Sequence, residues 1–306
     1  MARRGPTKYA KSAFNSKRKF PDYAGAIFVG RPDPYRRQVN SLNMRISGIG
    51  HALFGISVAG LAVLSLVYGN FAPILEPFPL ALPWPGAWVY GSGVILLAAS
   101  AGLFVARTAP ASAVIIAVYE LAWVVTRARP VFLKPASVGS WYGLGEALGP
   151  LVGVWILYAV LRRQFGAPAL TAMTGHRALK VARVLFGAAC VAYGAAHFAY
   201  AKYTAAMVPA WLPGPLGLAY LTGAAHAAAG IGLLVGVLPR LAAKLEAIML
   251  SLFGILVWLP SFFARPVPGW GSPAQVQWSE TFLTFLLAGS AWIVAASLRS
   301  APASRG

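Results

Sequence analysis

Charged residues are scarce in this sequence, and acidic residues are the scarcest of them. Aspartate and glutamate together number 7 in 306 residues, against 26 lysines and arginines, while hydrophobic residues make up 58% of the chain. The single cysteine, Cys190, excludes an internal disulfide, and there is no cysteine cluster, His-x-x-x-His pair or Glu-x-x-His motif to hold a metal. This composition excludes an ordinary soluble domain and predicts a multi-span membrane protein.

Long apolar stretches are abundant instead. A helix needs about 20 residues to cross roughly 30 Å of hydrocarbon. Eight stretches qualify, near residues 46–68, 87–106, 110–127, 145–162, 178–200, 215–237, 241–262 and 280–298. We therefore expect an all-α membrane protein with eight transmembrane helices.

The eight stretches form two similar groups of four. Residues recur in one order and at nearly one spacing in the pairs Phe54 and Phe186, Tyr68 and Tyr200, Pro77 and Pro209, Gly93 and Gly223, and Pro130 and Pro260. Such a match predicts a tandem duplication. We expect a tail over residues 1–45, a first repeat over 46–163 and a second over 178–299. Because each repeat has an even number of spans, the repeats should be two parallel four-helix bundles.

Basic residues indicate the orientation in the membrane. The tail alone carries eleven lysines or arginines, and with eight spans 21 of the 26 basic residues fall on the side of the tail. Cytoplasmic loops are enriched in such residues. We expect a multi-pass protein of a cell membrane, the inner membrane of a bacterium, with both termini in the cytoplasm.

The basic tail has two interpretations. Its lysines and arginines alternate with Tyr9, Phe14 and Phe20, which could suit a nucleic acid. A signal for topology that also lies on anionic lipid headgroups is the simpler interpretation, at about 1 kcal/mol per basic residue. We therefore treat the lipid bilayer as the partner and nucleic acid as an unlikely one.

Several short motifs in the second group resemble a known family. They are the runs Gly194–Phe198, Met207–Pro213, Leu221–Gly223 and Gly230–Leu234. In this order they resemble the DoxX/DoxD-like family of four-helix membrane proteins. The first group matches more weakly, with Ser65 at the position of His197 and Leu96 at that of His226. The resemblance implies redox chemistry at the membrane, since family members include a membrane subunit of a thiosulfate:quinone oxidoreductase.

Polar residues gather in the second group. Cys190, Tyr193 and His197 are three and four residues apart, so they share one face of the fifth helix. We place Tyr220 and His226 of the sixth helix across from them. Ionisable groups inside a bilayer are costly and often mark function.

This constellation has two main interpretations. It could be a quinone headgroup pocket, in which His197 and His226 exchange protons with ring oxygens, Tyr193 or Tyr220 adds a hydroxyl, and Trp211 covers the ring. Alternatively, the same groups could form hydrogen bonds between helices, worth about 1 kcal/mol each. Two imidazoles could also ligate a haem, but nothing in the sequence supplies the rest of a metal site.

Two glutamates occupy equivalent places in the two groups. Glu146 and Glu280 should open the fourth and eighth helices at the outer face, where the helix dipole favours a carboxylate. Arg129 or Lys134 is the expected partner of the first, and Arg265 of the second. A repeated ion pair and an outward-facing substrate clamp are both compatible with this pattern.

The remaining glutamates of the spans differ from each other. Glu120 falls near the middle of the third helix, where it is either neutral and hydrogen-bonded or paired across the bundle; a proton relay is one possible role. Glu246 lies near Arg240 and Lys244, which indicates a charge at the cytoplasmic boundary.

These patterns favour a membrane component of a redox process that contacts a quinone or similar lipid-soluble carrier, with other membrane or redox subunits as partners. The alternative is a non-catalytic anchor or assembly subunit of a larger complex. A small-molecule transporter is a third class, which the scarcity of intramembrane charge disfavours.

Cysteine labelling tests the orientation. A cysteine introduced beside Trp141 or Trp270 should react with an impermeant thiol reagent added to intact cells. The expected orientation of the eight spans places both residues at the outer face of the membrane. A cysteine beside Arg18 should be protected. Labelling beside Arg18 alone would overturn the orientation.

Overall fold

The computed structural model describes residues 48–73, 76, 83–165, 171–263 and 274–298, and these contain helices and no strand. Eight helices are long and apolar enough to cross a membrane, which confirms the predicted all-α class and the number of spans. They are α2 (Ile49–Tyr68), α3 (Pro85–Leu103), α4 (Ala109–Leu133), α5 (Val138–Phe165), α6 (His176–Ala199), α8 (Pro215–Val235), α9 (Pro239–Phe253) with its extension, and α11 (Ala274–Ser297). The tail over residues 1–45 lies outside the described residues.

The shorter elements join or extend these helices. A turn of 3-10 helix, η1 (Thr171–Met173), precedes α6, and α7 (Ala201–Met207) lies between α6 and α8. Helix α9 continues through a π-helical turn, η2 (Gly254–Trp258), into α10 (Leu259–Ser261). Pro130 lies inside α4, which continues to Leu133.

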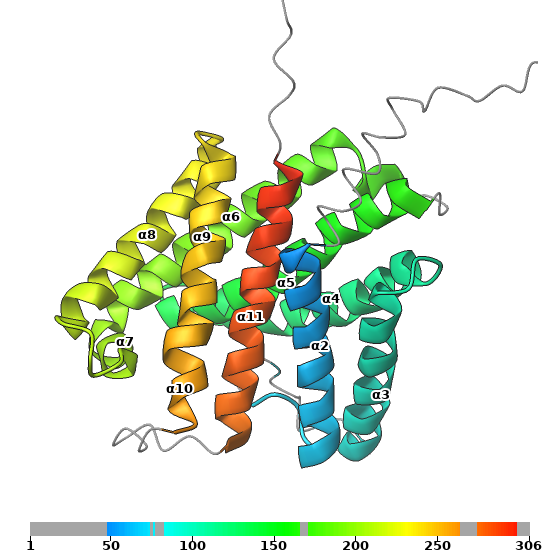
Figure 1. The fold of residues 1–306 in the computed structure, drawn as a ribbon, viewed down its shortest axis with the longest axis horizontal. Coiled ribbons are helices and arrows are strands. Elements are labelled where there is room, and N and C mark those ends of the chain that lie inside the picture. Colours follow the sequence, from blue (N-terminus) through cyan, green and yellow to red (C-terminus); the bar gives the residue numbers. More distant parts are fainter. Residues whose placement is uncertain (1–47, 74–75, 77–82, 166–170, 264–273, 299–306) are drawn as a thin grey trace, which may run out of the picture.

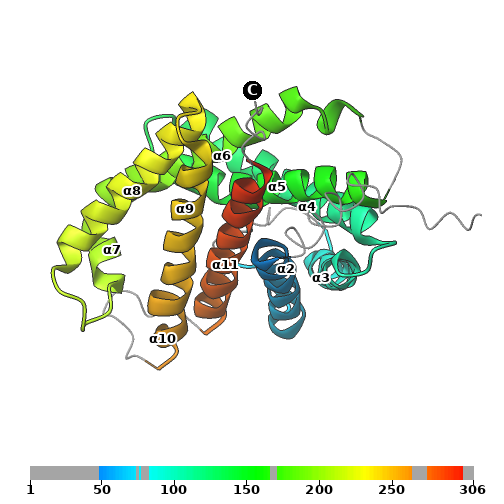
Figure 2. The same ribbon diagram turned by 45° about the horizontal axis from the view of Figure 1, so that its top comes forward.

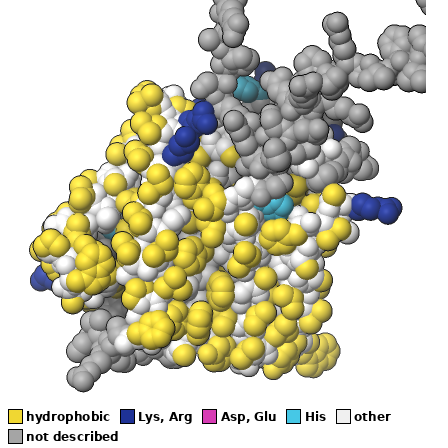
Figure 3. Space-filling model, viewed as in Figure 1, with side chains coloured by type: hydrophobic (Ala, Val, Ile, Leu, Met, Phe, Trp, Pro, Cys, Tyr) yellow, Lys and Arg dark blue, Asp and Glu magenta, His cyan; other side chains and the backbone are white. Residues whose placement is uncertain are grey.

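The helices pack in two layers. Helices α3, α2, α11 and α9 lie side by side in one layer, and α4, α5, α6 and α8 run diagonally behind it (Figures 1 and 2). Contacts between α3 and α4, between α5 and α11, and between α8 and α9 join the layers. Hydrophobic side chains cover the face seen in Figure 3, and the lysines and arginines visible there lie at its margins. Such a surface suits contact with lipid.

The two halves are not separate four-helix bundles. Helix α5, from the first half, packs against α6 of the second, while α11 packs against α2. About 72% of the most apolar stretch of α5 and 78% of that of α11 are buried, against 50% or less for the other six spans. The prediction of two bundles therefore needs correction, because the fourth helix of each half is central and shared.

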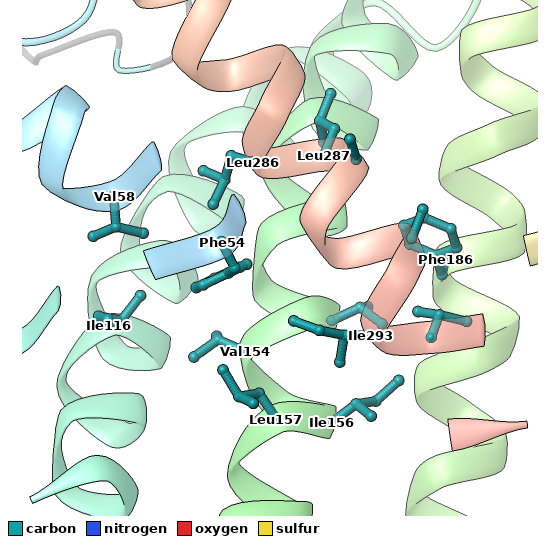
Figure 4. Packing of buried hydrophobic residues seen from close by; sticks show 14 of the residues in the cluster. Phe54, Val58, Ile116, Val154, Ile156, Leu157, Phe186, Leu286, Leu287 and Ile293 are labelled. Carbon is teal, nitrogen blue, oxygen red and sulfur yellow. The ribbon is translucent and has the colours of Figure 1, made fainter. Parts of the chain in front are cut away.

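Contacts within the halves follow one pattern. In each half the first helix contacts the second, the second contacts the third, and the third contacts the fourth. The aligned residues Phe54 and Phe186 are both fully buried in a single hydrophobic core, together with Leu286, Leu287 and Ile293 of α11 (Figure 4). This pattern agrees with a duplication, which stays a prediction.

Glycines set how closely α6 and α8 approach. A Cβ atom at Gly230 of α8 would lie 2.6 Å from the carbonyl oxygen of Gly187 in α6, and one at Gly194 would lie 2.7 Å from that of Gly223. Small residues allow this approach where lipid supplies no hydrophobic drive for helices to associate.

Substitution of these glycines tests the packing. Gly230→Leu should lower the free energy of unfolding by about 1–3 kcal/mol, because the added side chain would overlap backbone atoms of α6. Gly217→Leu in the same helix is the matched control, since no atom lies within 4 Å of its Cβ position. Thermal unfolding in detergent measures both. Equal melting temperatures for the two variants would contradict the observed helix crossing.

Candidate functional site

A cavity of about 410 Å³ lies in the second half of the protein. Residues of α5, α6, α7, α8, α9, η2 and α11 line it, and most of these are apolar. Among them are Leu256, Val257 and Trp258 of the π-helical turn, an irregularity that often occurs at functional sites. The polar side chains in its wall are Tyr142, Glu146, Tyr193, His197, Thr204, Thr222, His226, Glu280 and Thr284.

A buried polar pair, of which His226 lines the cavity and Glu246 lies behind it, joins α8 to α9. The Nδ1 atom of His226 lies 2.7 Å from Oε1 of Glu246, and the two side chains are 2% and 0% exposed. A carboxylate buried in an apolar interior requires such a partner. When Nδ1 of a neutral His226 donates to the ionised Glu246, Nε2 is left to accept a proton or a hydrogen bond.

Glu246 was expected to be a boundary charge, and the structure shows otherwise. It points into the protein on the buried face of α9, together with Ala243, Ala247 and Leu250. Spacing of three, four and seven residues defines that face, so the apolar pattern around Glu246 was the signal that could have identified it. Its basic neighbours in sequence suggested a surface position instead.

His197 lies beside this pair. Its ring centroid is 4.9 Å from that of His226, and its ring stacks on Phe253 at 5.9 Å. Nδ1 of His197 is 2.9 Å from the hydroxyl of Thr222, which itself donates to the carbonyl of Leu218 at 2.8 Å. Thr222 thereby links the imidazole of His197 to the backbone of α8.

Tyr193 completes this part of the wall. Its hydroxyl donates a 2.7 Å hydrogen bond to the carbonyl of Gly145 in α5, and its ring meets that of His226 edge-on at 5.7 Å. Cys190, one turn earlier in α6, lies beside the Glu246 carboxylate. The structure therefore brings Cys190, Tyr193, His197 and His226 together.

Two other predicted members lie elsewhere. Tyr220 is 47% exposed and stacks on Phe198 at 6.1 Å, while Trp211 is 69% exposed and does not line the cavity. Six residues separate Tyr220 from His226, a rotation of about 240° around a helix of 3.6 residues per turn. The tyrosine therefore faces away from the histidine.

A second ionisable cluster lines the same cavity from the centre of the protein. Glu146 of α5 and Glu280 of α11 lie within electrostatic range of each other and of the Arg127 guanidinium. Tyr142 donates a hydrogen bond to Glu146. Arg127 rests on α5, since a Cβ atom at Gly143 would lie 3.0 Å from its Nη1.

The partners predicted for these glutamates differ from those observed. Arg129 and Lys134 are exposed, and Arg265 lies outside the described residues. Glu146 also lies well inside α5, because that helix begins at Val138, seven residues before the expected start. Arg127, two positions before Arg129 on α4, faces α5 and is the observed partner.

Glu120 is buried but lies apart from the cavity. Its charged neighbour is Glu76, which accepts hydrogen bonds from the Tyr119 hydroxyl at 2.6 Å and the Ala72 amide at 2.8 Å. Burial raises the pKa of Glu76, and these two hydrogen bonds oppose the shift. Within the part of the chain that the structure describes, Glu120 therefore has a carboxyl group and no basic side chain as its charged neighbour, and neither glutamate lines the cavity.

The first half carries no counterpart of the histidine pair at the aligned positions. Leu96 and Ile116 are buried where His226 and Glu246 would fall, and the hydroxyl of Ser65 bonds back to the carbonyl of Leu61. Within the described residues, no three His, Cys, Asp or Glu side chains come together in a way that could hold a metal ion.

Comparison with curated proteins and with solved structures gave no match. Residues 178–259 match the family model DoxX. That segment contains His197, His226 and Glu246, and it spans α6, α8 and α9. This multi-pass membrane protein is therefore similar to the DoxX family over residues 178–259 of its second half.

Proposed function

We propose that the cavity binds the headgroup of a quinone or a similar lipid-soluble carrier and exchanges protons with it, as the membrane component of a redox process. The His226–Glu246 pair on an apolar cavity is the observation that carries this proposal. An imidazole oriented by a carboxylate can give and take a proton near neutral pH. His197 places a second imidazole beside it.

The chemistry requires little more from this chain. Reduction of a quinone takes up two electrons and two protons, and oxidation of the quinol releases them. We assign binding and proton exchange to this chain, and the electrons to a redox subunit that associates with it. Glu246 would stabilise His226 in its charged form while the proton is in transit.

The position of the cavity supports a ligand that arrives through lipid. Leu245, Ile248 and Leu252 of α9 line the cavity and are also exposed on the outer surface of the helix. A neighbouring groove of about 670 Å³ between α8 and α9 shares Leu245 and Met249 with the cavity and is almost entirely apolar. The apolar chain of a membrane carrier would fit such a groove.

The cavity distinguishes this proposal from an anchor or assembly subunit. Hydrogen bonds that only hold α8 to α9 need no open space beside them, whereas here the imidazoles line a cavity large enough for an aromatic headgroup. A scaffold remains the competing function. In that case the histidines would contribute to stability and to nothing else.

Both termini are proposed to be cytoplasmic, in a bacterial inner membrane. The start of α2, the end of α5, the start of α6 and the end of α11 lie at one end of the molecule (Figure 1). Arg162 and Arg163 at that end bond to Thr174 at 2.9 and 2.8 Å. Basic residues at this end support a cytoplasmic location.

Thermal unfolding with and without a short-chain quinone tests the proposed function. At a ligand concentration of about 100 times Kd, binding should stabilise the wild-type protein by about 2.7 kcal/mol. His226→Ala, His197→Ala and Glu246→Gln should each lose most of this stabilisation, because each removes part of the proton-exchanging group.

Ser65→Ala in the first half is the control and should keep the full quinone-dependent shift. Because Ser65→Ala removes one structural hydrogen bond, it should lower the free energy of unfolding by about 1 kcal/mol, equally with and without quinone. Equal quinone-dependent shifts in the wild type and all three site variants would favour the scaffold.

A further inference from the structure

The cavity has ionisable groups at two places in its wall. His226 and His197 line it from α8 and α6, whereas Tyr142, Glu146 and Glu280 line it from the central helices α5 and α11. The proposed chemistry of the histidines makes no use of this second group. Because this second group lines the same cavity, its side chains would also face a bound ligand.

The charges of the second group do not balance. Among the residues that the structure describes, Arg127 supplies the one guanidinium that interacts with Glu146 and Glu280. Glu146 is 2% exposed, and both glutamates belong to membrane-spanning helices. Two carboxylates and one guanidinium would leave a net negative charge in a region where uncompensated charge is costly. One proton bound to the carboxyl pair makes the cluster neutral.

The cluster also adjoins a second open space. A crevice of about 470 Å³ lies where α4 and α5 are joined, lined by Arg127, Pro130, Leu133, Lys134, Ser137, Gly139 and Ser140. Four of these side chains, Arg127, Lys134, Ser137 and Ser140, are charged or polar. Arg127 borders the crevice and also interacts with Glu146 and Glu280, so the cluster lies between the crevice and the cavity.

The side chains of Tyr142 and Tyr193 lie between the cluster and the histidines. The Tyr142 hydroxyl bonds to Glu146, and the Tyr142 ring lies 6.1 Å from that of Tyr193. Tyr193 in turn contacts His226, with 5.7 Å between ring centroids. A ligand in this cavity would therefore have ionisable groups on two sides.

We propose that Glu146 and Glu280, held by Arg127, form a proton-transfer site that connects the crevice at the α4–α5 junction with the ligand in the cavity. In the transfer step the O–H bond of the shared carboxyl group breaks while an O–H bond forms on a ligand oxygen, and a hydrated proton from the crevice then binds the carboxylate and leaves water behind. The reverse sequence carries a proton outward. The proposal rests on the proposed function only in the identity of the acceptor, a reduced quinone oxygen whose electrons come from the partner subunit.

Infrared difference spectroscopy of the full chain in nanodiscs tests this proposal without quinone. The wild type should show a C=O band of a protonated carboxyl group that shifts when H₂O is replaced by D₂O. Glu146→Gln and Glu280→Gln should each abolish that band entirely, because either change leaves one carboxylate to balance one guanidinium. Such mutual dependence is the expected sign of a shared proton.

Glu120→Gln is the matched control, since it removes a buried carboxyl group that lies away from the cavity; the shared band should persist in this variant. Ser140→Trp should fill the crevice and slow the exchange of that band in D₂O. Absence of the band from the wild type, or its retention in both Glu146→Gln and Glu280→Gln, would overturn the proposal. So would unchanged exchange in Ser140→Trp. Thermal unfolding checks that each variant is folded, and these results hold whether or not a quinone binds.

Discussion

The contact between α5 and α11 is the constraint on which the rest of the site depends. These two helices occupy the centre, and their approach is close because Gly149 and Gly153 of α5 leave room for Leu287 and Ser290 of α11. The same contact brings Glu146 near Glu280. Because α5 also packs on α6, it supplies the carbonyl of Gly145 that receives the Tyr193 hydroxyl. The cavity is therefore built by both halves of the chain, although the DoxX match covers only the second.

Placing charge inside a membrane protein requires partners on other helices. His226 of α8 is bonded to Glu246 of α9, and Arg127 of α4 interacts with glutamates of α5 and α11. Removing one member of such a group leaves an uncompensated buried charge, at a cost of several kcal/mol. These groups consequently hold neighbouring helices in register. Beside the His226–Glu246 pair lie the cavity and the groove between α8 and α9, both lined mostly by apolar residues.

Sequence patterns predicted the class of fold and part of the site. Eight apolar stretches were enough for eight spans, and helical spacing was enough to place Tyr193 and His197 on one face. Pairing between helices was less predictable. Glu246 and Arg127 were missed because the choice among neighbouring charged residues depends on a rotation of one or two positions around a helix. From the sequence alone, the rotation of a helix about its axis can be inferred only where its apolar residues form one clear face.

Packing of α5 on α6 was missed for a different reason. Contacts within a repeat and contacts between repeats use the same small and apolar residues, so composition does not distinguish them. Four apolar stretches per repeat suggested a self-contained bundle. Only the extent of burial, which is far greater for α5 and α11 than for the other spans, reveals that they are shared.

The central helices α5 and α11 contact both halves of the chain. The halves can therefore differ in their polar residues while both are still needed to form the cavity. At the aligned positions the first half has Leu96 and Ile116 where the second has His226 and Glu246. Loss of a polar pair from one half leaves that half apolar and stable in the bilayer, since no unpaired charge remains. Helix α5 nevertheless still forms a wall of the cavity and carries Glu146. Under the proposed duplication, the first half therefore could lose its own site while it remained necessary for the site of the second.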